Sequence, residues 1–303
     1  MSLISSCGEN YDGQLSLNDS LHPSLCNITL NQQSDPIFSD SIEQIVSSSF
    51  TMILGRDPES NQTTLYMCGK CQGKGVNKTE DEDKISLQKV SMDWNVANVA
   101  VGFDHSAMLL ESGEVKVVGR NVYGQLGCDL IGESKEWIDL EVSPTLLKNK
   151  AYDIKVTRIS CGSYHTSLIA KYVENGKQKT GLFYTGSYGR GTKTSSLVYL
   201  PVPCANDDEL VDVKSGQNYA CVLTRNGCVF GFGRNASGQL GIGPVTTKNK
   251  EVAKPTKMKG IENVKIVALS CGGSHTALVT SNHMVLVCGD NGSGQLGLGD
   301  KKE

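Results

Sequence analysis

The chain has 303 residues, a formal net charge of −3, a sequence pI of about 6.0, 33 glycines and few aromatic side chains. Because it lacks a basic excess, we do not expect nucleic acid or chromatin as a partner. No apolar run approaches the length of a membrane span, and the first residues lack the basic start and apolar core of a signal peptide. We therefore expect no membrane association and a cytoplasmic location, with the nucleus as the alternative.

Short strands separated by tight turns are predicted along most of the chain. Segments such as 96–101 and 115–118 are rich in β-branched and apolar residues and are bounded by Gly, Asn, Asp or Ser. Asn226-Gly227 is a hairpin signal, because this pair readily adopts the positive φ angles of a tight turn. No stretch shows sustained apolar spacing at the helical period. The sequence therefore predicts an all-β fold.

Two motifs alternate along these strands, and together they repeat about every 56 residues. The first motif is Gly-x-x-His followed by Ser or Thr, and it occurs with its variants at 47–51, 102–106, 162–166, 216–220 and 272–276. The second motif is Gly-x-Asn-x-x-Gly-Gln-Leu-Gly, complete at 119–127, 233–241 and 289–297 and degenerate at 8–15, 69–73 and 186–189. A repeat of this length is typical of stacked arrays, in which no unit buries its apolar surface alone.

The combination of the two motifs resembles the regulator of chromosome condensation repeat family, and the resemblance extends from residue 7 to residue 300. It implies a single β-propeller domain over 1–303 with about five to six recognisable four-stranded blades, incomplete relative to a seven-bladed ring. The first and last units both offer the strand of the second motif. The sequence therefore leaves open whether six blades close with one incomplete or the arc stays open. The expected units are 1–41 (partial), 42–95, 96–153, 154–208, 209–262 and 263–303.

Residues that recur at the repeat spacing are expected to hold the repeats together. In a propeller the motif histidines would be spread around the ring, so we interpret them as buried side chains bonded to backbone groups between strands or blades, rather than as a catalytic or metal-binding set. The glycines would supply positive φ or close approach of strands, and the glutamines would brace their own turns. The residues in question are His105, His165, His275, Gly119, Gly124, Gln125, Gly233, Gly238, Gln239, Gly289, Gly294 and Gln295.

No arrangement for catalysis or cofactor binding is evident in the sequence. Many of the eleven cysteines occupy equivalent positions in different repeats, which is typical of small buried apolar residues rather than disulfide partners. Cys68 and Cys71 form a lone Cys-x-x-Cys pair without a second pair to complete a zinc site. We therefore expect no cofactor, no metal and no catalytic residue, and no enzyme activity apart from nucleotide exchange.

The segments that differ between repeats are the candidates for partner binding. The hairpin at 170–181 is expanded relative to the other repeats, and lengthened loops on a rigid scaffold are common binding sites. Its side chains Lys171, Tyr172, Lys177 and Lys179 are the first candidates, with a solvated loop as the alternative.

Three further features are candidates for contact with a partner. Trp137 lies in the long connection 126–147, where it is either an exposed anchor or a side chain tucked against its blade. The acidic run at 79–84 is either a solvated loop or a contact for a basic partner. Asp104 lies in the first motif, and the family resemblance implies acidic and polar residues on one propeller face for nucleotide exchange.

The expected function is a non-catalytic protein–protein interaction module, a scaffold or adaptor that uses the loops of a propeller face. The resemblance also implies the alternative, a guanine nucleotide exchange factor for a Ran-like small GTPase. The expected partner is thus a protein, with a small GTPase as the specific alternative.

Overall fold

The computed structural model describes residues 4–9, 21–28, 42–48, 50–57, 60, 62–69, 88–90, 92–130, 132–148, 150–189, 193–205, 207–299 and 301, with the backbone alone at 4–9, 21–28, 68, 69 and 88. The described residues form 21 strands and the short 3-10 helix η2 (Pro144–Leu147). Among them, no helix has the length and apolar character needed to cross a bilayer.

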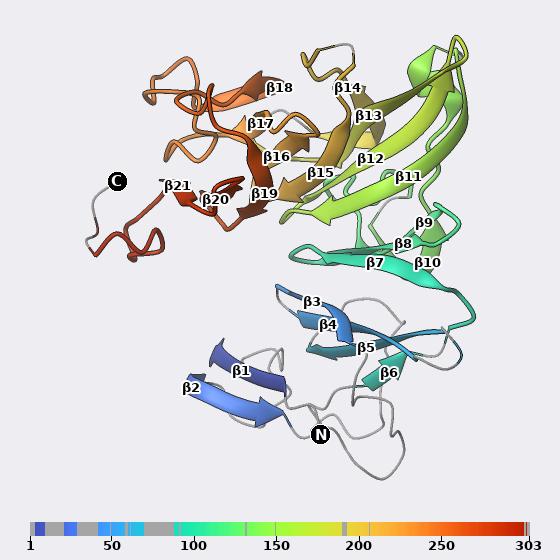
Figure 1. Ribbon diagram of the computed structural model, residues 1–303. Helices are drawn as coiled ribbons and strands as arrows, with labels where there is room; N and C mark the ends of the chain where they lie inside the picture. The colour runs from blue at the N-terminus through green and yellow to red at the C-terminus, as the bar shows by residue number, and fades with distance from the viewer. Residues whose placement is uncertain are drawn as a thin grey trace.

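Each sheet is an antiparallel meander, and the sheets follow one another around a curved array (Figure 1). The first sheet contains β1 (Ile4–Glu9) and β2 (Leu21–Ile28); the second contains β3 (Ile42–Ser47), β4 (Phe50–Arg56), β5 (Thr63–Gly69) and β6 (Gln88–Val90). The third contains β7 (Val96–Val101), β8 (His105–Leu110), β9 (Val115–Arg120) and β10 (Glu133–Asp139). The fourth contains β11 (Ala151–Cys161), β12 (His165–Glu174), β13 (Lys177–Gly186) and β14 (Thr194–Leu200). The fifth contains β15 (Leu210–Ser215), β16 (Tyr219–Thr224), β17 (Val229–Arg234) and β18 (Glu251–Lys257), and the sixth contains β19 (Ile266–Cys271), β20 (His275–Thr280) and β21 (Val285–Gly289).

The all-β propeller predicted from the repeats is confirmed, with two differences of detail. The first unit was expected to be partial, and its sheet contains two strands among the described residues, whereas the sixth sheet contains three of the four strands expected for a complete blade. In addition, β11 begins at Ala151, ahead of the unit boundary expected at 154. The long β11 accompanies the lengthened strands of its own blade, so that boundary shifts towards the N-terminus.

The core lies between successive sheets rather than within any one of them. All six side chains of β8 and all six of β16 are buried, because each of these strands is covered on both faces by neighbouring sheets. Strands buried on both faces do not show a polar–apolar alternation. The sixth sheet differs, since Val267 is 50% exposed and Val285 is 64% exposed. One face of this sheet is therefore left uncovered.

The two motifs lie at the same end of the third, fourth, fifth and sixth sheets. In a meander, the turn between the first two strands and the connection after the third strand share one end, while the hairpin between the second and third strands lies at the other. We call the end that carries both motifs the motif face and the opposite end the hairpin face. Backbone bonds join the motif turns of four successive sheets: the Phe103 amide donates to Ser163 O (3.3 Å), the Ser163 amide to Gln217 O (2.9 Å) and the Gln217 amide to Gly273 O (3.1 Å).

The second motif is held by its own asparagine and glutamine side chains. The amide of Leu126 donates to Asn121 Oδ1 (2.8 Å), and the amide of Tyr123 donates to Gln125 Oε1 (2.8 Å). The same two bonds recur in the other complete copies, from Leu240 and Leu296 to their asparagines and from Ser237 and Ser293 to their glutamines. This side chain geometry explains why Asn and Gln recur at these spacings.

At two junctions, the first motif joins a blade to the next through side chains as well as through backbone groups. His105 Nε2 lies 3.0 Å from Thr166 Oγ1 of the following blade, and Thr166 donates in turn to Gln125 O (2.7 Å). Where Tyr219 replaces the histidine, its hydroxyl lies 3.1 Å from Thr276 Oγ1 of the following blade and also bonds to Gly272 O (3.2 Å). The aromatic position thus pairs with the hydroxyl that follows the same position one blade later.

His165 breaks this pattern. The residue that would supply its hydroxyl in the next blade is Ala220, and both ring nitrogens of His165 are buried without a hydrogen-bond partner among the described residues. The expectation that each motif histidine bonds to backbone groups is therefore wrong here. The Thr-to-Ala difference between repeats leaves a buried polar group unsatisfied, at a cost of about 1–3 kcal/mol.

We expect Ala220→Ser to stabilise the protein by about 1 kcal/mol, because the added hydroxyl would satisfy one ring nitrogen of His165. Thr166→Ala should do the opposite by about 1–2 kcal/mol, since it removes the partner of His105. Urea unfolding of both variants measures the two changes. Equal losses in both variants would contradict the role given to the hydroxyl.

Candidate functional site

Three aromatic side chains form a cluster on the motif face. Phe103 and Tyr164 come from the first-motif turns of the third and fourth sheets, and Tyr123 comes from the loop after β9. The ring centroids of Tyr123 and Tyr164 lie 4.7 Å apart, and those of Phe103 and Tyr164 lie 5.9 Å apart with the rings edge to face. Phe103 is 54% exposed and Tyr123 is 41% exposed. Large apolar side chains grouped at a surface are typical of binding sites.

Asp104 lies beside this aromatic cluster and is held in place from below. Gln125 Nε2 donates to Asp104 Oδ1 (2.9 Å), and the backbone amide of Arg120 donates to Asp104 O (2.8 Å). Partial burial raises the pKa of the Asp104 carboxyl above its usual value, although the Gln125 bond and the nearby Arg120 charge oppose this shift. Burial, with the Asp104 charge, also raises the pKa of Tyr164, so that its hydroxyl remains a hydrogen-bond donor.

A broad hollow of about 760 Å³ continues from the aromatic cluster across the fourth and fifth sheets. Tyr123 and Tyr164 form one side of it, and the rest of its lining combines small and uncharged polar residues with three cationic residues and one carboxylate. These charged residues are Lys193, Arg234, Lys250 and Glu251. The combination of exposed aromatic rings with a cationic surround favours a partner that brings apolar groups and carboxylates.

The structure gives the expanded hairpin its shape on the hairpin face. Strands β12 and β13 contain 10 residues each, whereas β8 and β16 contain 6. The turn at Asn175 and Gly176 has φ angles of 52° and 73°, as a two-residue hairpin requires. Lys177 is exposed, and Lys179 Nζ lies 2.5 Å from Glu174 Oε2.

Tyr172 and Trp137 are not exposed anchors. Tyr172 is 4% exposed and packs into the core beside Leu147, because it lies on the side of the hairpin that faces the third sheet. Tyr172 was predicted to be a partner contact of the projecting hairpin, and its burial corrects that prediction. Trp137 is half-buried against the core between the second and third sheets, which is the tucked arrangement left open above. Lys171 is half-buried, and its role stays a prediction, as do those of Lys177 and Lys179.

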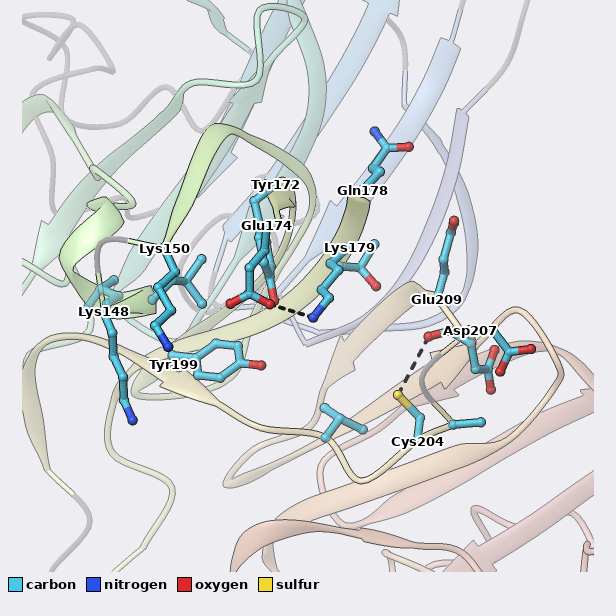
Figure 2. A pocket seen from close by; sticks show the side chains of 16 residues that line it. Lys148, Lys150, Tyr172, Glu174, Gln178, Lys179, Tyr199, Cys204, Asp207 and Glu209 are labelled. Atoms are coloured by element: carbon cyan, nitrogen blue, oxygen red, sulfur yellow. Dashed lines mark hydrogen bonds and ion pairs between the residues drawn. The ribbon is translucent and has the colours of Figure 1, made fainter. Parts of the chain in front are cut away.

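A groove of about 460 Å³ lies beneath the hairpin, and we call it the hairpin groove (Figure 2). Tyr172, Glu174, Gln178, Lys179 and Thr180 form the hairpin wall. The other walls come from the end of η2 and the segment after it, from Tyr199 of β14, and from the connection between β14 and β15. It lies at the opposite end of the sheets from the aromatic cluster, so the two are separate surfaces.

Several residues singled out in the sequence have side chains outside the part of the chain that the structure describes. Cys68, Cys71 and the acidic run at 79–84 lie outside the side chains that the structure describes. Within the described part of the chain, no group of three or more His, Cys, Asp or Glu residues is placed to hold a metal ion. The aromatic cluster was missed in the sequence, although its signal was present: Phe103 and Tyr164 occupy the variable positions of an otherwise repeated motif.

Comparison with known proteins identifies the family of these repeats. Two profiles of the regulator of chromosome condensation (RCC1) repeat match this chain, one at 112–169 and 226–279 and the other at 96–125, 210–239 and 266–295. A probable E3 ubiquitin-protein ligase of Homo sapiens, HERC6, is 32% identical over 239 residues, which cover 76% of this chain and 21% of that protein. The ultraviolet-B receptor UVR8 of Arabidopsis thaliana is 25% identical over 256 residues, covering 80% of this chain and 54% of the receptor.

Solved structures show the same fold. The structure of human WBSCR16 superposes with a TM-score of 0.72 at 20% identity and covers 99% of this chain, which spans 74% of that structure. Prp20p from Saccharomyces cerevisiae gives a TM-score of 0.72 at 18% identity, with 99% of this chain and 70% of Prp20p covered. This chain spans about a fifth of the length of HERC6 and about half that of UVR8. The repeats, the propeller and these matches together place the chain in the regulator of chromosome condensation (RCC1) repeat family.

Proposed function

We propose that the protein is a non-catalytic interaction module, a scaffold or adaptor, that binds a protein partner through the motif face. The observation that carries this proposal is the exposed cluster of Phe103, Tyr123 and Tyr164 on a rigid set of turns. Hydrogen bonds between successive motif turns fix the backbone that carries this cluster, so its rings lose little conformational freedom on binding. Aromatic side chains in such settings carry much of the energy of protein interfaces.

The partner we propose brings an apolar side chain to the aromatic cluster and carboxylates to the neighbouring hollow. Three cationic residues line that hollow, compared with one carboxylate. Charge of this kind steers association and fixes the register of a complex. We place this interaction in the cytoplasm, in keeping with the expectation from the sequence.

The test is capture of partners from cytosolic extract by purified protein and by its Tyr123→Ala variant. We expect the variant to capture the principal partner at least about tenfold less well, because interface tyrosines contribute about 2 kcal/mol or more. Tyr152→Ala is the matched control, since Tyr152 is 58% exposed but lies at the start of β11, at the hairpin end. If both variants capture the partner equally, the motif face is not the binding surface.

A second candidate function is guanine nucleotide exchange on a Ran-like small GTPase. It is favoured by the acidic Asp104 on the motif face and by the likeness to Prp20p, whose structure was described with its binding properties to Gsp1p and histones. An exchange factor must bind the nucleotide-free GTPase much more tightly than the loaded form. Capture in parallel with and without EDTA separates the two candidates: a small GTPase retained only with EDTA supports exchange, and nucleotide-independent capture of other proteins supports a scaffold.

A further inference from the structure

The expanded hairpin leaves part of β13 paired on one side only. Strand β12 pairs with β13 all the way to Lys177, but the pairing of β14 with β13 ends at the Leu182–Leu200 pair. The outer strand ends at Leu200, directly before Pro201 and Pro203, whose rings fix φ at about −65°, away from the extended strand conformation. The segment from Lys177 to Gly181 is therefore a free strand edge.

The alternation of an antiparallel ladder identifies the free groups. The two-residue turn makes Glu174 and Lys177 a hydrogen-bonded pair, so Lys177, Lys179 and Gly181 direct their backbone groups towards β12. Gln178 and Thr180 direct theirs outwards, in phase with Leu182, which faces β14. Among the described residues, none bonds to the amide or carbonyl of Gln178 or Thr180. The edge thus offers two donors and two acceptors.

This edge is fixed in place before any partner binds. The amide of Leu210, at the start of the fifth sheet, donates to Thr180 Oγ1 (2.8 Å). On the other side of the hairpin, Tyr172 is buried in the core and interacts with Tyr199. A pre-formed edge binds an added strand at a lower entropic cost than a mobile loop would.

The hairpin groove runs along this edge and has opposite charges at its two ends (Figure 2). Lys148 and Lys150 lie at one end, and Asp207 and Glu209 lie at the other. Lys148 is the C-cap residue of η2, and its backbone is left-handed with a φ of 58°. Lys179, between these ends, is already paired with Glu174.

We propose that the free edge of β13 binds an extended peptide strand of a protein partner, with a carboxylate towards Lys148 and Lys150 and a basic side chain towards Asp207. Backbone bonds to Gln178 and Thr180 would hold the strand, and the charged ends of the groove would set its direction. A second copy of this chain does not suit the edge, because antiparallel self-pairing brings the lysines that flank Gln178 near their own equivalents. The surface is separate from the motif face and acts independently of it.

The test measures binding of three fluorescein-labelled peptides with an alternating Thr-Val core by fluorescence anisotropy. One peptide has Asp at its amino end and Lys at its carboxyl end, the second has these exchanged, and the third has Ser at both ends. We expect one of the charged peptides to bind at least about tenfold more tightly than the Ser peptide. Equal binding of all three, or no binding, overturns the proposal.

Variants of Gln178 test the backbone contacts themselves. Gln178→Pro removes one outward amide at a position where an edge strand tolerates proline, and it should weaken binding of the preferred peptide by about tenfold. Gln178→Ala keeps the amide and should bind within about twofold of the wild type. Thermal melting shows whether the proline variant is folded, and N-methylation of alternate peptide amides gives the same test without changing the protein. Unchanged binding after both backbone changes overturns the proposal.

The proposals for the motif face and for the β13 edge can be tested separately. Tyr123→Ala lies at the opposite end of the sheets and should leave peptide binding unchanged. Formation of a dimer through the β13 edge, detected as a doubled mass in light scattering that Gln178→Pro abolishes, would replace the peptide by a second copy and also overturn the proposal.

Discussion

Lowering the pH from 7 to 4 is expected to destabilise the protein by about 3 kcal/mol for each of His105 and His165. Burial lowers the pKa of His105 to about 4 and that of His165 to about 3, because the charged imidazolium cannot be hydrated between the blades. Well above pH 6.5 both side chains are neutral in the folded and unfolded protein, so they cause little pH dependence there. Below pH 6.5 the unfolded chain binds protons that the folded chain does not, so stability falls until the pH reaches the folded pKa values.

Substitution at His165 isolates its share of this acid effect. Phe50 occupies the equivalent position in an earlier repeat, so His165→Phe keeps an aromatic ring in a position that accepts one. We expect the variant to lose about half of the additional destabilisation between pH 7 and pH 4, as measured by urea unfolding at each pH. His283→Gln removes an exposed histidine and serves as the control for side chain loss. An unchanged pH dependence in His165→Phe would mean that this imidazole is not buried in its neutral form.

The repeat pattern predicted those parts of the structure in which equivalent residues form the same contacts in each complete copy. Asn121 and Gln125 close their loop in one blade, and their counterparts do so in two others, so their spacing alone indicated a structural role. The partner of His105 could not be predicted in this way, because it is a hydroxyl one repeat away in the sequence and one blade away in space. For the same reason, the sequence did not predict that Ala220 leaves the ring nitrogens of His165 without a hydroxyl partner, because the two residues lie in adjacent blades.

The candidate surfaces were only partly predictable. Hairpin length was evident from the sequence, but the orientation of Tyr172 was not, because it depends on which face of a long strand the third sheet covers. The open edge was not predicted, because it depends on the register of β13 with both of its neighbours. The aromatic cluster joins residues from two blades, and its distances required the packed structure.

Gly124→Ala is expected to cost about 3–5 kcal/mol of stability. Gly124 has a φ of 80°, and a Cβ atom there would lie 2.0 Å from Thr194 O and 2.8 Å from Ser195 Cα of the neighbouring blade. The clash is with backbone, so no side chain rotation relieves it. The carbonyl of Gly124 also accepts a bond from Thr185 Oγ1 (2.7 Å), which resists any movement of the loop.

The sixth sheet provides a matched control for the seam between blades. Gly294 occupies the same position of the second motif with a φ of 78°, but a Cβ atom there would meet no other heavy atom of the described residues within 4 Å. Gly294→Ala should therefore cost only the backbone strain, about 1 kcal/mol. The difference between the two variants, measured by thermal and urea unfolding, is the contribution of close blade packing at Gly124. Equal losses would show that the positive φ of the loop, rather than contact between blades, requires glycine at this position.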